Sequence, residues 1–86
     1  MQLQKLKILA EAGAVQRVEA MPDLQAGWIV WITYATRSGE RREALDRQRG
    51  GARVFATLDA VARCLAGLGL TGFQVNSAGL AGEASP

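Results

Sequence analysis

The chain has 86 residues, of which 49% are hydrophobic and 21% charged, and its formal net charge is +2. This length gives room for one hydrophobic core, and the composition is typical of a globular domain, not of a disordered segment. The sequence has no histidine, which excludes the commonest general base and the commonest neutral metal ligand.

Three segments in the first half of the chain have clear periodicities. Apolar residues recur every three or four positions in LQKLKILAEAGA, which predicts a short amphipathic helix over residues 2–12. VQRVEAM, at residues 15–21, predicts a first strand. WIVWITYAT, at residues 28–36, is β-branched or aromatic almost throughout and apolar on both faces. We expect this third segment to be a central strand.

The second half predicts a hairpin and a second helix. A polar turn at residues 37–40 precedes RREALDRQ, so the segment 41–48 is expected to be a polar partner strand of the central one. Residues 58–68 carry an apolar stripe at helical spacing, and Thr57 is well placed as the N-cap of that helix.

The predicted elements define an α+β fold of two layers. A short N-terminal helix comes first, followed by a three-stranded antiparallel meander, a core-facing helix and a short final strand in TGFQVNS, with the helices on one face of the sheet. We expect a single domain over residues 1–76 and a disordered tail at 77–86.

The central strand predicts an interface. If both helices cover one face of the sheet, the other face still carries an apolar set that contains either Trp28 or Trp31, and the sequence does not say which. Exposed apolar patches of that size usually mark an interface. We therefore expect Trp28 or Trp31 to contribute to a homodimer contact or to a contact with a partner protein.

Six arginines lie between Thr36 and Phe55, against three acidic residues. Arginine suits bidentate contact with phosphate, so these residues predict a nucleic-acid surface that contacts the DNA backbone. They are Arg37, Arg41, Arg42, Arg47, Arg49 and Arg53. The alternative is an edge hairpin that charge keeps from aggregating, in which case the working surface is the apolar sheet face and DNA is not contacted.

Catalytic chemistry has little support in this sequence. Cys64 falls in the middle of an apolar helix with no base beside it, which favours a core residue over a nucleophile. The carboxylates are dispersed among basic residues and do not resemble an acid/base pair. We therefore expect a non-enzymatic binding module with no catalytic residues, metal or other cofactor. Without an export signal or a span-length apolar run, the expected location is the cytoplasm, away from membranes.

Three stretches carry a resemblance to a known family. LQKLKILAEAGAV, GWIVWITYATRSGE and ARVFATLDAVARCLAGLGLTGFQV resemble small plasmid-borne proteins of the ParC family of partition-associated proteins, which are unrelated to the topoisomerase subunit of similar name. The likeness extends to about Asn76, and its motifs are structural. It implies a bacterial, plasmid-linked accessory protein that acts in DNA maintenance or transfer through partners, and it supplies no catalytic residues.

Overall fold

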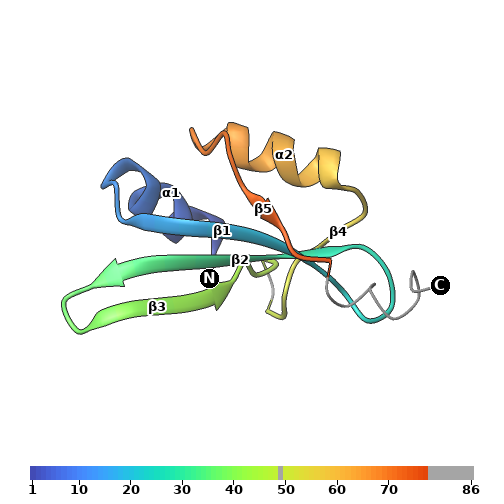
Figure 1. The fold of residues 1–86 in the computed structure, drawn as a ribbon, viewed down its shortest axis with the longest axis horizontal. Coiled ribbons are helices and arrows are strands. Elements are labelled where there is room, and N and C mark those ends of the chain that lie inside the picture. Colours follow the sequence, from blue (N-terminus) through green and yellow to red (C-terminus); the bar gives the residue numbers. More distant parts are fainter. Residues whose placement is uncertain (49, 78–86) are drawn as a thin grey trace.

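A computed structural model of the chain describes residues 1–48 and 50–77. Within these residues it has two helices and a five-stranded sheet, which confirms the predicted α+β class (Figure 1). In chain order the elements are α1 (Leu3–Glu11), β1 (Val15–Pro22), β2 (Trp28–Thr36), β3 (Gly39–Ala44), β4 (Val54–Phe55), α2 (Leu58–Ala66) and β5 (Gln74–Val75). The tail predicted at 77–86 lies, apart from Ser77, outside the described residues.

The sheet is built around β2, which pairs along both of its edges. β1 runs antiparallel to it on one edge, from Val15 opposite Tyr34 to Pro22 opposite Trp28. β3 runs antiparallel on the other edge, so the predicted three-stranded meander is confirmed. β5 joins the far side of β1 as a short parallel strand, and the order is therefore β3-β2-β1-β5.

The edge of β2 that faces β3 is shared with a second strand, which the sequence did not predict. The polar strand expected over residues 41–48 ends at Ala44. Leu45 still donates its backbone amide to Val30, but the chain then leaves the sheet and returns as β4, which pairs with the start of β2. Leu45 is fully buried, whereas the three residues that follow it in the chain are polar.

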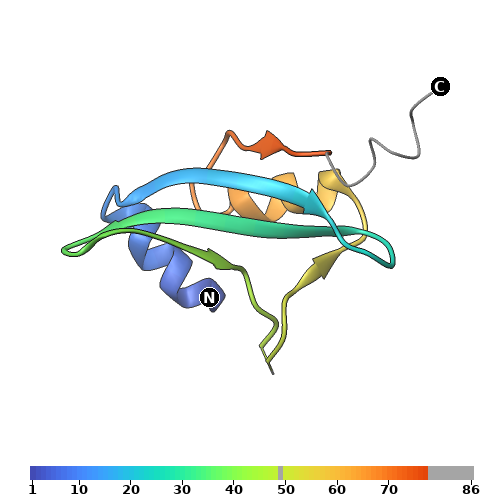
Figure 2. The same ribbon diagram turned by 60° about the horizontal axis from the view of Figure 1, so that its bottom comes forward.

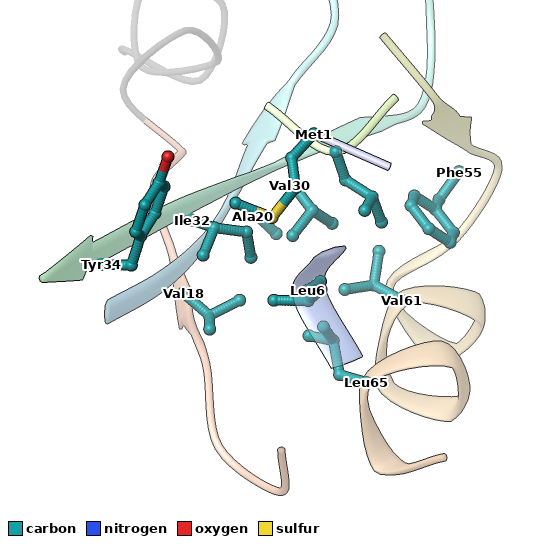
Figure 3. Close-up of a cluster of buried hydrophobic side chains, with 11 residues drawn as sticks. Met1, Leu6, Val18, Ala20, Val30, Ile32, Tyr34, Phe55, Val61 and Leu65 are labelled. Atoms are coloured by element: carbon teal, nitrogen blue, oxygen red, sulfur yellow. The ribbon is translucent and has the colours of Figure 1, made fainter. Parts of the chain in front are cut away.

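Both helices cover the same face of the sheet (Figures 1 and 2). Leu6 from α1 meets Val61 and Leu65 from α2 over Val30 and Ile32 of β2, and all five side chains are fully buried (Figure 3). Burying a side chain of this size stabilises the fold by about 1.5–3 kcal/mol. This one cluster is the core of the domain.

The two tryptophans of β2 lie on opposite faces. Trp28 packs against the core, on the face that also carries the buried Tyr34. Trp31 is half-buried and projects from the other face, which we call the open face because neither helix packs on it. Val18 and Ala20 of β1 are buried on the core side, in keeping with the alternation of side chains along a strand.

Helix α2 begins as the sequence predicts. The Thr57 hydroxyl accepts a hydrogen bond from the amide of Ala60 at 3.1 Å, and Asp59 places a negative charge in the first turn. The helix ends at Ala66, with Gly67 as its C-cap. Leu58 and Leu68, at the two ends of the apolar stripe, and Cys64 between them are half-buried and pack against the core.

A glycine makes the contact between β2 and β4 possible. Gly27 has a positive φ of +83°, and a Cβ atom at this position would lie 2.5 Å from the carbonyl oxygen of Phe55. The backbones of the turn and of β4 can approach this closely only when residue 27 has no side chain.

Replacing Gly27 by alanine should destabilise the domain by roughly 2–4 kcal/mol, because the strain of a positive φ adds to a clash that separates β4 from β2. Gly13→Ala is the matched control: Gly13 also has a positive φ, of +70°, but a Cβ atom there would meet nothing within 4 Å. The control should lose only about 1–2 kcal/mol. Urea denaturation of both variants measures the difference, and equal losses would contradict the close contact.

Candidate binding surfaces

The structure divides the predicted arginine surface into two groups. Arg37 lies in the turn between β2 and β3, and Arg41 and Arg42 lie on β3. Arg47 and Arg53 lie in the loop of residues 45–53, between β3 and β4. Arg49 lies outside the described residues. The described members of the predicted set therefore belong to two segments, the hairpin of β2 and β3 and the connection that follows it.

The hairpin of β2 and β3 ends in a tight polar turn. Thr36 donates its hydroxyl to the carbonyl oxygen of Gly39 at 2.7 Å and accepts from the amide of Ser38 at 3.1 Å. Gly39 has a φ of +119°, which favours glycine. Arg37 sits at this turn, exposed, at the end of the sheet that extends beyond both helices (Figure 1).

The hairpin arginines differ in their partners. Arg41 and Arg37 are exposed, and within residues 1–48 and 50–77 neither has an acidic partner. Arg42 points to the open face. It lies opposite Thr33, which is on the same side of β2 as Trp31 because side chains alternate sides along a strand. There its Nε lies 3.6 Å from a carboxylate oxygen of Glu19. Arg37 and Arg41 are thus the charges of the hairpin that remain available to a ligand.

The open face carries a cluster centred on Trp31. The guanidinium of Arg42 lies 4.3 Å from the centre of the Trp31 ring, and one of its terminal nitrogens lies 3.2 Å from the sulfur of Met21. Glu19, only 12% exposed, is also within 4.0 Å of Arg17. A stacked arginine and tryptophan are residue types enriched at interface hot spots. The open face is therefore a candidate contact surface for a protein.

A second polar cluster joins α1 to the hairpin on the core side of the sheet. Lys5 donates to the Tyr34 hydroxyl and to a carboxylate oxygen of Glu43, each at 3.0 Å, and the Tyr34 hydroxyl donates to the same oxygen of Glu43. The hydrogen bond from Tyr34, followed by that from Lys5, lowers the pKa of Glu43. The bonds to Tyr34 and then to Glu43 raise the pKa of Lys5. The sequence gives no signal for this cluster, because its members come from three separate elements.

Arg47 and Arg53 lie where the connection between β3 and β4 approaches α1. The guanidinium of Arg53 stacks over the Phe55 ring at 4.6 Å, and the Nε of Arg47 donates to the carbonyl oxygen of Gly50 at 3.2 Å. Arg47, Arg53 and Lys7 of α1 line the same groove. Lys7 was not among the predicted site residues, because nothing in the sequence places the first helix beside this loop.

The described part of the chain has neither a cluster of metal ligands nor a helix that could span a membrane. No three of its cysteine, aspartate and glutamate side chains come together to hold a metal ion. Cys64 packs against the core, as predicted. Across residues 1–48 and 50–77, neither helix has the length and hydrophobicity needed to cross a bilayer.

No protein-family model, curated protein or solved structure matches this chain. A proposal about the function therefore depends on the residues of this chain, and the resemblance to the ParC family stays a prediction.

Glu43→Gln should remove a pH-dependent part of the stability. Because the pKa of Glu43 is lowered in the folded state, the unfolded chain takes up this proton first as the pH falls, so the stabilisation is complete above the ordinary glutamate pKa and is lost below it. We expect the variant to be about 1 kcal/mol less stable than the wild type at pH 7 and to approach it at pH 3.

Urea midpoints measured from pH 7 to pH 3 test this. Glu40→Gln, also on β3 but exposed and without an ion pair in the described residues, should follow the wild type at every pH. The cluster has no such role if Glu43→Gln and the wild type lose equal stability over this range.

Proposed function

We propose that this chain is a non-enzymatic accessory module that contacts DNA, or a partner already bound to DNA, through the hairpin of β2 and β3. The observation that supports this most is the pair Arg37 and Arg41, which are exposed and without an acidic partner among the described residues, at an end of the sheet that extends beyond the helices. An arginine fork at such a position suits phosphate oxygens.

The hairpin fits backbone contact better than base reading. Arg41 lies opposite Tyr34 and Arg42 opposite Thr33, so the two side chains leave opposite faces of the ribbon. Arg42 is paired with Glu19 on the open face, so Arg37 and Arg41 are the residues that reach phosphates. Contacts of this type give affinity that depends on salt and little on sequence. The resemblance to the ParC family supports a role in plasmid maintenance or transfer, in the bacterial cytoplasm.

The double substitution Arg37→Ala with Arg41→Ala should weaken binding to a random labelled duplex. We expect the plot of log affinity against log salt to become shallower by about two units, one for each arginine that no longer reaches a phosphate. Fluorescence anisotropy between about 50 and 200 mM salt measures this slope.

The control is Arg17→Ala with Arg63→Ala, which removes the same net charge from β1 and α2. Arg63 is exposed, and Arg17 lies beside Glu19. The control should keep most of the slope. Equal losses in the two double variants, or no binding by the wild type at the lower salt, would contradict the proposal.

A second candidate function is a protein-interaction adaptor that works through the open face. It is favoured by Trp31, which lies half-buried beside Met21 and Ile29 on the face that neither helix covers. The predicted homodimer would place two such faces back to back and bury these side chains. Trp28 packs against the core on the opposite face, so among the predicted interface residues only Trp31 is available for this contact.

Trp31→Ser should then halve the mass measured in solution by light scattering while the far-UV circular dichroism stays that of the wild type. Leu24→Ser is the control, because Leu24 is a fully exposed apolar residue between β1 and β2. It should leave the mass unchanged. A wild type that is already monomeric, or a Trp31 variant with the wild-type mass, would argue against a dimer through the open face.

A further inference from the structure

A groove runs between α1, residues 46–48 and 53 of the connection between β3 and β4, the start of β4 and Leu68 just after α2. Its volume is about 1020 Å³. Three hydrogen bonds hold the loop against the start of α1. The amide of Asp46 donates to the carbonyl oxygen of Met1 at 2.6 Å, and the amino group of Met1 donates to the Asp46 carboxylate at 2.5 Å. The side-chain amide of Gln2 donates to the backbone carbonyl oxygen of Arg47 at 3.2 Å. Figure 2 shows the loop beside the N-terminal end of the helix. The two walls are thus fixed relative to each other.

The charge of the groove is positive. Lys7 comes from α1, Arg47 and Arg53 come from the connection between β3 and β4, and Asp46 is the single acid among the described residues that line the groove. Lys7 and Arg47 are exposed, and the structure gives them no acidic partner within residues 1–48 and 50–77. A groove with this charge attracts an anionic ligand.

The same groove has an aliphatic surface. Leu3 is 39% exposed and Val54 is 47% exposed, and Leu68 lies half-buried beside them. Leucine and valine side chains gain nothing from a phosphodiester backbone, whereas they bury well against aliphatic groups. The ring of Phe55, the residue after Val54, is 5% exposed and stacked under Arg53, so it offers no free face to a nucleic-acid base.

Glutamine side chains complete the lining. Gln4 and Gln48 are exposed at the groove, and each amide can both donate and accept a hydrogen bond. This matches the alternating donors and acceptors of a peptide backbone. The ligand that uses all three features has carboxylates, aliphatic side chains and peptide groups.

We propose that this groove binds an acidic, amphipathic peptide segment of a partner protein. Lys7 and Arg47 pair with the carboxylates of the segment, and Leu3, Val54 and Leu68 receive its aliphatic side chains. The site is separate from the hairpin and does not depend on the DNA contact proposed there. It gives the module two independent surfaces, one for a protein and one for DNA.

The test uses the full chain and three labelled synthetic peptides in fluorescence anisotropy. The first carries glutamate and leucine in alternation, so that an extended backbone offers its peptide groups to the groove. The second replaces every leucine by serine, and the third replaces every glutamate by lysine. We expect only the first to bind. Lys7→Ala with Arg47→Ala should weaken its binding by roughly fivefold or more, because the variant cannot form two exposed ion pairs.

Two further variants separate the possible results. Arg37→Ala with Arg41→Ala should leave peptide binding unchanged, so that failure of the DNA proposal and failure of this one are distinguishable. Leu3→Ser should weaken the first peptide without altering the fold, since Leu3 is exposed on α1. The proposal is overturned if the first peptide does not bind, or if the serine peptide binds equally well. It is also overturned if duplex DNA or anionic lipid vesicles displace the peptide and bind the Lys7→Ala, Arg47→Ala variant more weakly than the wild type.

Discussion

The pairing of β2 along both edges is the constraint on which the rest of the structure depends. One edge pairs with β1 from Trp28 to Tyr34, and the other is divided between β3 and β4. With its backbone satisfied in this way, β2 can present Val30 and Ile32 to both helices as the floor of the core. Each candidate surface lies at one part of this strand. The hairpin lies at its end, the open face lies at Trp31, and the groove lies near the point where β3 ends and β4 begins along one edge.

The charged residues follow from that arrangement. Arginines that are close in sequence separate, because β3 sends neighbours to opposite faces and the chain leaves the sheet after Leu45. Glu19 forms an ion pair with Arg42, and Glu43 forms one with Lys5. A run that is strongly basic as a sequence becomes two small cationic sites with different neighbours. One sits on a polar turn and the other on an aliphatic groove, which is why the two suit different ligands.

Local patterns were enough to predict the meander, the two helices and the Thr57 cap, since each depends on residues close together in the chain. Strand β4 could not be predicted, because two residues have no periodicity and their pairing depends on the return of the chain. The face of the sheet on which Trp31 lies could not be predicted for a related reason. β1 is polar on one side at Arg17 and Glu19, but only the register, with Glu19 opposite Trp31, transfers that polarity to β2. The groove depends on tertiary contacts alone.

The loop between β3 and β4 begins and ends at one point of the sheet. The amide of Arg53 donates to the carbonyl oxygen of Leu45 at 2.8 Å, and Asp46 forms a bridge with Ala52. Additional residues inserted between these anchors would lengthen the loop without moving either strand, and the entropy of closing a loop rises only slowly with its length. This is where the domain can accept a fused reporter or an insertion, whereas added residues beside Gly27 would force β4 away from β2.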